Sequence, residues 1–126
     1  IGKEKVPYFI YPNDDAVFSM AGIYDTWVDP SSGSIHKTFS MLTCTSNPLM
    51  AEIHNTKNRM PVILSKEHEE NWLQGNLNSK ELELPFPDQF IKAHQINKKI
   101  INSKKANVPE VLLPFDNQVY EQGSLF

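Results

Sequence analysis

The chain has 126 residues, with 12 lysines and arginines, 15 aspartates and glutamates and a single cysteine. This length fits one modest globular domain, and no apolar run approaches the ~20 residues of a membrane-spanning helix. The net charge of −3 argues against a protein that binds nucleic acid over its whole surface, while the lone Cys44 excludes an intrachain disulfide and fits a reducing, cytoplasmic compartment.

The first residues differ from a typical start of a chain. There is no initiator methionine, and residues 1–5 form no apolar segment of the kind that directs secretion. A strand-like run follows almost at once. The sequence therefore indicates a fragment or a processed chain, and we expect a domain that is truncated at its amino terminus.

The first part of the chain is predicted to be mainly strand. Residues 7–12 form a short aromatic strand bounded by prolines, and residues 16–27 form a longer strand in which Gly22 marks a bulge or a close approach. The composition of residues 29–34 predicts a turn. The alternating residues 37–46 are then expected to return beside the second strand as a hairpin.

Two short helices are predicted in the middle of the chain. Asn47 can cap a helix over residues 49–54, with Pro48 at its first position. Ser65 can cap a second helix, which Gly75 ends.

The other segments give weaker signals. A buried strand is predicted at residues 60–64 and a lysine-containing strand at residues 90–101, and residues 108–115 close the fold. Residues 79–87 fit neither helix nor strand clearly.

Short strands and short helices without a regular alternation predict the α+β class. We expect a single domain over residues 1–115, with a bent, mainly antiparallel sheet and short helices. Residues 116–126 have no periodicity and are expected to form a tail.

The candidate functional residues gather around the first predicted helix. His54 ends that helix, where the helix dipole favours a protonated imidazole and suits a proton shuttle, although a simple capping role explains the position as well. Arg59 precedes a buried strand, where a guanidinium can hold a phosphate or form a salt bridge that fixes the loop. Thr43, Thr45 and Ser46 supply hydroxyls that can receive an anion, besides ordinary capping.

Other chemistry has less support in the sequence. Cys44 with His54 would suit a cysteine hydrolase, but a lone cysteine in an alternating strand is more often a core residue. The four histidines are scattered, so no metal site is predicted. With five glycines and no glycine-rich phosphate loop, no cofactor is expected either.

Charge and aromatic residues are distributed unevenly. Trp27 is the candidate for base stacking, whereas the other strand aromatics, Tyr24 among them, are expected in the core. Five lysines lie in the acid-free segment between Asp88 and Glu110, and they indicate either a positive face or a solvated surface. These lysines are Lys92, Lys98, Lys99, Lys104 and Lys105.

Several motifs in order resemble the carboxy-terminal half to two-thirds of the SRAP family, the SOS response-associated peptidases that process abasic sites. The motifs are "PYFI", "MAGIYDTW", "TFSMLTCTSNPLMAEIH", "RMPVIL", "EENWL" and "INKKIINSKKANVPEVLLP". The ordered combination is specific, although each piece alone is a weak signal.

The resemblance implies a protein that binds single-stranded DNA and joins covalently to abasic sites. In the family an amino-terminal cysteine forms a thiazolidine with the ring-opened sugar aldehyde, assisted by an asparagine, a glutamate and a histidine. His54 matches the family's histidine, and Arg59, Thr43 and Thr45 match positions that hold DNA phosphates. The family name also implies peptidase or autoproteolytic activity, including self-release of the cross-link. A monomer with no metal and no membrane partner is expected.

This chain departs from the family in three respects. The family's cysteine, asparagine and glutamate belong to a part that it lacks, and Cys44 cannot replace the nucleophile because a thiazolidine needs a free α-amino group beside the thiol. Asp25 stands where the second motif usually has glutamate. Four residues separate His54 from Arg59, where many members have one.

Two alternatives to a cross-linking protein follow from the residues. One is a non-covalent module that binds single-stranded DNA through the lysines between residues 92 and 105 and through Arg59. The other is a cysteine hydrolase that uses Cys44 and His54.

Overall fold

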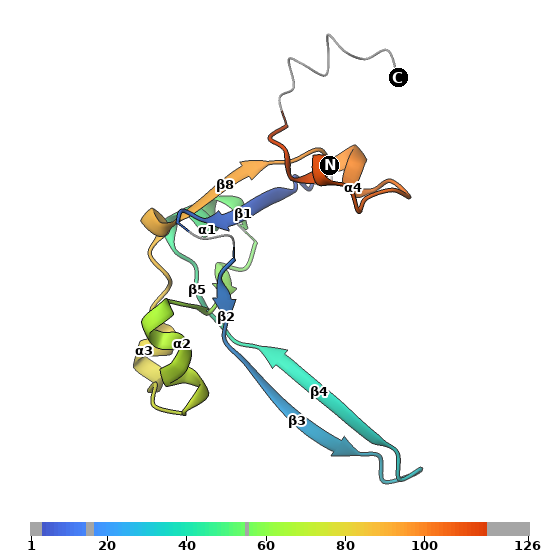
Figure 1. The fold of residues 1–126 in the computed structure, drawn as a ribbon, viewed down its shortest axis with the longest axis vertical. Coiled ribbons are helices and arrows are strands. Elements are labelled where there is room, and N and C mark those ends of the chain that lie inside the picture. Colours follow the sequence, from blue (N-terminus) through green and yellow to red (C-terminus); the bar gives the residue numbers. More distant parts are fainter. Residues whose placement is uncertain (1–3, 15–16, 55, 116–126) are drawn as a thin grey trace. The chain divides into compact units, whose positions relative to one another are not determined.

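The computed structural model describes residues 4–14, 17–54 and 56–115, so the predicted tail at residues 116–126 lies outside the described residues. These residues divide into two compact units. Unit 1 contains residues 4–11 and 92–115, and unit 2 contains the described residues between 12 and 91. Figure 1 shows the helices and strands of the two units.

Unit 1 is built on two paired strands, β1 (Tyr8–Pro12) and β8 (Ile91–Gln95). The last residue of β1, Pro12, and the first residue of β8, Ile91, belong to unit 2. A short helix α4 (Lys98–Ile101) and a 3-10 helix η2 (Pro109–Leu112) follow. The prediction of one strand over residues 90–101 is wrong beyond Gln95. The reason is local, because the buried side chain of Asn97 accepts a hydrogen bond of 2.9 Å from the Lys99 N–H and so begins a helix.

Unit 2 contains three antiparallel strand pairs. They are β2 (Ser19–Met20) with β7 (Ile63–Leu64), β3 (Gly22–Val28) with β4 (Ile35–Met41), and β5 (Thr43–Thr45) with β6 (Arg59–Pro61). Together with the short helices they confirm the predicted α+β class. In place of one continuous sheet, the described strands form two-stranded sheets.

Three residues without strand assignment join the three pairs at one point. The Ala21 N–H donates to the Val62 carbonyl at 2.8 Å, the Val62 N–H to the Leu42 carbonyl at 2.9 Å, and the Leu42 N–H to the Ala21 carbonyl at 2.9 Å. Ala21 and Val62 are buried. This closed triangle of backbone hydrogen bonds interrupts the long strands predicted at residues 16–27, 37–46 and 60–64, because each segment changes its partner there.

The β3–β4 hairpin extends from this junction (Figure 1). The predicted close approach at Gly22 is confirmed, since a Cβ there would lie 3.1 Å from the Ser40 carbonyl oxygen. The turn at residues 29–34 is also present, and hydrogen bonds from Ser31 to the Asp29 carboxylate lower the pKa of Asp29 below its ordinary value of 3.8.

The aromatic residues of this hairpin contradict one prediction. Tyr24 faces Phe39 across the two strands, and they are 89% and 86% exposed. Tyr24 is therefore not a core residue. The physical reason is that a two-stranded ribbon buries a face only where another layer covers it, and among the described residues none covers this one.

The helices of unit 2 follow the predicted caps. Asn47 caps α1 (Pro48–Ile53), and Ser65 caps α2 (Lys66–Leu73), after which Gly75 has a φ of +73°. Residues 79–87, left open by the sequence, begin with α3 (Ser79–Glu83) and lead to the 3-10 helix η1 (Asp88–Phe90). In the described part of the chain, no helix is long and apolar enough to cross a membrane.

Candidate functional site

The antiparallel pair of β5 and β6 brings three predicted site residues to one face. Thr45 lies opposite Arg59 in the ladder, and Thr43 lies opposite Pro61. Residues opposite each other in an antiparallel pair, and residues two apart on one strand, point to the same side of a sheet. Thr43, Thr45 and Arg59 are all exposed. Two hydroxyls and a guanidinium therefore share one accessible face, which we call the threonine–arginine face.

The opposite face of the same ladder is buried. Cys44 pairs with Met60, and they are 8% and 1% exposed. Their burial fixes the register of the ladder, because a shift by one residue would move Arg59 into the core and Met60 into water. The apolar side of β6 thus determines which way the guanidinium points.

His54 lies in the connection between these two strands. It follows the last residue of α1, and its N–H donates to the Met50 carbonyl at 2.7 Å. The residue is exposed, and within the described part of the chain its ring makes no hydrogen bond or ion pair. The imidazole is therefore accessible to a ligand, and the end of α1 fixes the backbone of this residue.

Asn47 anchors α1 and with it the position of His54. This side chain is 2% exposed. Its Oδ1 accepts a hydrogen bond of 2.8 Å from the Met50 N–H, and its Nδ2 donates to the Phe86 carbonyl at 2.7 Å. One buried amide thus starts the helix and ties it to the segment before η1.

Two features of this region were not predicted. Asn58, directly before Arg59, has a φ of +50°, a left-handed conformation that asparagine tolerates better than most residues. Its carbonyl accepts from the Ser46 N–H at 3.2 Å, one backbone hydrogen bond beyond the last pair of the ladder. The Oγ of Ser46 is buried and has no hydrogen-bond partner in the described structure. Asparagine is common in turns, so Asn58 was a possible turn signal. Nothing in the sequence indicated that the Ser46 hydroxyl would be unpaired.

Cys44 is unsuited to act as a nucleophile. Its side chain lies on the face opposite to Thr43 and Thr45, and burial raises the pKa of its thiol above the ordinary value of 9.0. A protonated, buried thiol is unreactive. This geometry gives no support to the cysteine hydrolase.

We expect the Cys44 thiol to react slowly with iodoacetamide at neutral pH in the folded chain and at the rate of a free thiol in urea. Because the thiol has its higher pKa in the folded state, the unfolded chain releases the proton first. The free energy of unfolding should then fall as pH rises above about 9. Mass spectrometry of timed samples measures the labelling. Rapid alkylation of the folded chain at neutral pH would contradict the burial.

The remaining candidates lie elsewhere. Trp27 is half exposed on the hairpin and lies 5.5 Å from the His36 ring, centroid to centroid. The five lysines between residues 92 and 105 belong to unit 1. Among the described residues, no group of three or more histidine, cysteine or acidic side chains is arranged to hold a metal.

Comparisons with known proteins agree on one family. The family model described as SOS response associated peptidase (SRAP) matches residues 1–103. The chain is 34% identical over 119 residues to the abasic site processing protein YoaM of Bacillus subtilis, an alignment that covers 87% of this chain and 48% of that protein. It is 33% identical to the abasic site processing protein HMCES of Pongo abelii, which covers 79% of this chain and 28% of that one.

A solved structure has the same fold. The crystal structure of a protein from Bacteroides thetaiotaomicron matches with a TM-score of 0.79 and 40% identity, over 92% of this chain and 51% of that protein. The chain thus spans about half the length of YoaM and of this solved protein.

Proposed function

Because this chain belongs to the SOS response associated peptidase (SRAP) family, we propose that it holds single-stranded DNA at an abasic site. We propose further that a form carrying the family's amino-terminal cysteine joins covalently to that site. The observation that carries the proposal is the threonine–arginine face together with an accessible His54 in the connection between its two strands. The names of the relatives, abasic site processing proteins, support it.

The threonine–arginine face has the chemistry to grip a DNA backbone. A guanidinium can form two parallel hydrogen bonds to a phosphate, and hydroxyls donate to the same oxygens. Arg59 is the first residue of β6, and the next residue, Met60, is buried. The backbone of Arg59 is therefore held firmly. Contacts of this kind position the strand without reading its sequence, as required for a lesion that has lost its base.

His54 is proposed to move protons at the sugar. An abasic sugar reacts through its open-chain aldehyde, and ring opening requires a proton on the ring oxygen and removal of one from the hydroxyl. The amine and thiol of an amino-terminal cysteine then add to the aldehyde carbon. One C–N and one C–S bond form, and the carbonyl oxygen leaves as water. An exposed imidazole that makes no hydrogen bond within the described structure is free to serve these steps.

Any hydrolytic step is assigned to the same site. The family description names a peptidase. Self-release of the cross-link is the reverse reaction, in which water returns the aldehyde, the amine and the thiol. Cys44 is not a candidate for this step, because it is buried and the pKa of its thiol is raised. We therefore propose that His54 transfers the proton in this direction too.

The proposed site needs only one chain. Arg59, both threonines and His54 all belong to unit 2, so we propose a monomer as the active form. A single buried, reduced cysteine is compatible with the cytoplasm, which we propose as its location.

A denaturing gel with a single-stranded oligonucleotide carrying one abasic site tests the proposal. We expect a covalent band from a form that carries the amino-terminal cysteine. The 126-residue chain should give no such band, because Cys44 has no α-amino group beside its thiol. An oligonucleotide of the same sequence without the lesion is the control for both proteins.

The result distinguishes the proposal from its main rival. If the cysteine-bearing form binds DNA with a salt-dependent affinity but gives no covalent band, this protein is a non-covalent DNA-binding module. The lysines of unit 1 are the observation that favours this second function.

A further inference from the structure

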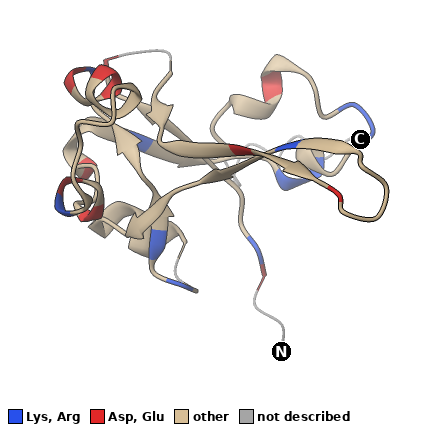
Figure 2. Ribbon diagram, turned by 90° about the horizontal axis from the view of Figure 1, so that it is seen from below, with Lys and Arg blue, Asp and Glu red and all other residues tan. Residues whose placement is uncertain are grey.

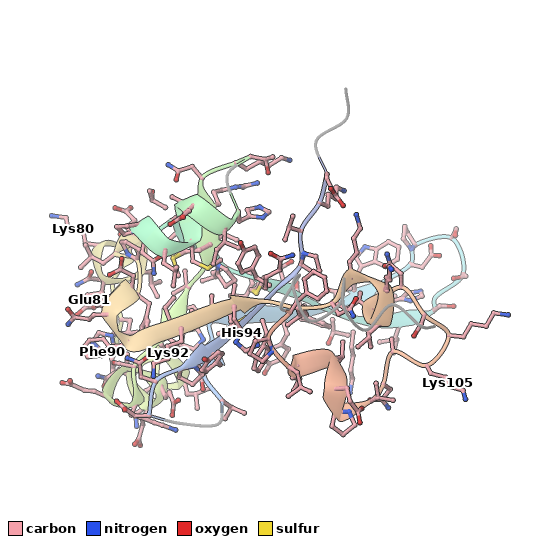
Figure 3. All side chains as sticks on the ribbon, turned by 90° about the horizontal axis from the view of Figure 1, so that it is seen from above. Lys80, Glu81, Phe90, Lys92, His94 and Lys105 are labelled. Carbon is pink, nitrogen blue, oxygen red and sulfur yellow. The ribbon has the colours of Figure 1, made fainter. Side chains whose placement is uncertain are left out.

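Unit 1 is electropositive in an otherwise acidic protein. Its described residues include six lysines and two glutamates, whereas those of unit 2 include ten acidic and five basic residues. Figure 2 shows the blue ribbon of lysines on α4 and the loop after it, and in Figure 3 Lys105 extends outward from that loop. Positive charge is therefore concentrated on the smaller unit, and an anionic partner is attracted most strongly there.

A groove of about 780 Å³ lies within unit 1. Its lining combines three lysines, Lys5, Lys98 and Lys99, with an apolar wall that includes Pro7 and Phe115. A volume in this range fits a nucleotide-sized ligand and is far larger than a single phosphate needs. Cationic side chains beside an apolar and aromatic wall are the combination that holds a nucleotide of a single strand.

The positive charge of the groove is largely uncompensated. Lys98 lies 3.7 Å from Glu4 in an exposed ion pair, which contributes little. Lys5 and Lys99 have no carboxylate within 4.0 Å among the residues that the structure describes. Helix α4 has four residues, so the attraction for an anion comes from the side chains and not from a helix dipole.

Asn97 provides a directed donor in this groove. It lines the groove and is 6% exposed. Its Oδ1 accepts from the Lys99 N–H at 2.9 Å, while its Nδ2 has no acceptor within the described residues. The Nδ2 does not belong to the buried, unpaired side-chain atoms of the described structure, so it reaches solvent and is available to a ligand oxygen.

We propose that the unit 1 groove binds a nucleotide of the single DNA strand, with the phosphate at Lys5, Lys99 and Asn97 and the base against Pro7 and Phe115. The inference rests on the proposed function for the identity of the partner. It adds a second contact on the strand, made by residues other than those that hold the abasic nucleotide. The unit 1 groove should bind the strand whether or not the DNA carries a lesion.

Fluorescence anisotropy with a short labelled oligothymidylate without a lesion tests the groove, using the full 126-residue chain over a series of salt concentrations. Each phosphate that is no longer neutralised should lower the salt slope of log affinity by ~0.7 for a single strand. Both lysines hold the same phosphate, so the Lys5→Gln, Lys99→Gln double variant should lower the slope by ~0.7. The matched control is the Lys37→Gln, Lys80→Gln variant, which removes the same charge from unit 2 and should leave the slope nearly unchanged.

Asn97→Asp isolates the amide donor. An aspartate keeps the acceptor for the Lys99 N–H and is a favourable N-cap, so circular dichroism should show an unchanged fold. It replaces the free donor with a carboxylate, and we expect about tenfold weaker binding of the oligothymidylate. Unchanged affinity in this variant would overturn the inference.

Two further outcomes would also overturn it. An equal loss of salt slope in the unit 1 and unit 2 variants would mean binding by overall charge alone. Tight binding of thymidine monophosphate without binding of the oligonucleotide would assign the groove to free nucleotides. The proposed function fails separately, because it predicts a covalent band at saturating DNA that the groove variants should retain.

Discussion

Replacing His54 by alanine is expected to slow formation of the covalent DNA adduct by about 100-fold in the cysteine-bearing form, the lower range of what a positioned acid–base group contributes. The side chain is exposed and makes no hydrogen bond among the described residues, so the free energy of unfolding should change by less than about 0.5 kcal/mol. Single-turnover gels with excess protein over abasic oligonucleotide measure the rate.

The matched control for this change is His36→Ala. His36 is also exposed and also in unit 2, but it lies on the β4 strand of the hairpin beside Trp27. Its replacement should leave the rate unchanged. A role of His54 in holding a phosphate would lower the affinity together with the rate. We expect the rate to fall while the affinity for the abasic oligonucleotide changes little, and equal rates for the two variants would mean that His54 only ends a helix.

The short helices were predictable because their signals are local. Asn47 and Pro48 start α1, Ser65 starts α2, and Gly75 takes the left-handed conformation after it. Each of these effects acts within one helical turn, so it is present in the sequence without any knowledge of the rest of the fold.

The strand pairing was not predictable in the same way. Apolar alternation continues through Ala21, Leu42 and Val62, but the backbone of each forms hydrogen bonds with the other two. These bonds join residues that lie 20 to 41 positions apart, and no residue type encodes them. The strands are therefore shorter than the pattern suggests, and they change partner at the junction.

The site shows the same division between local and distant information. Alternation along one strand predicts that Thr43 and Thr45 point to the same side. That Arg59 joins them depends on the register between β5 and β6, which is set by the buried pair of Cys44 and Met60. The exposure of Tyr24 could not be predicted either, because the sequence of a strand gives no information on whether another layer covers that strand.

The largest effect on stability is expected from Asn47→Ala. Loss of the helix cap costs about 1 kcal/mol. The Phe86 carbonyl also loses its 2.7 Å hydrogen bond inside a partly buried site, which costs about 1–3 kcal/mol more. The free energy of unfolding, measured in urea, should therefore fall by about 2–4 kcal/mol in total.

Asn78→Ala is the control that separates these two contributions. Asn78 caps α3 through the same bond, with its Oδ1 3.0 Å from the Glu81 N–H. It is exposed, and its side-chain NH2 group makes no hydrogen bond in the described structure, while its backbone N–H donates to the Glu81 carboxylate at 2.9 Å. Its loss should cost only the cap, about 1 kcal/mol. If both variants lose the same stability, the bond from Asn47 to Phe86 contributes nothing. If Asn47→Ala loses clearly more, the bond from Asn47 to Phe86 fixes α1. The cross-linking rate should then fall too, because His54 is positioned by the end of this helix.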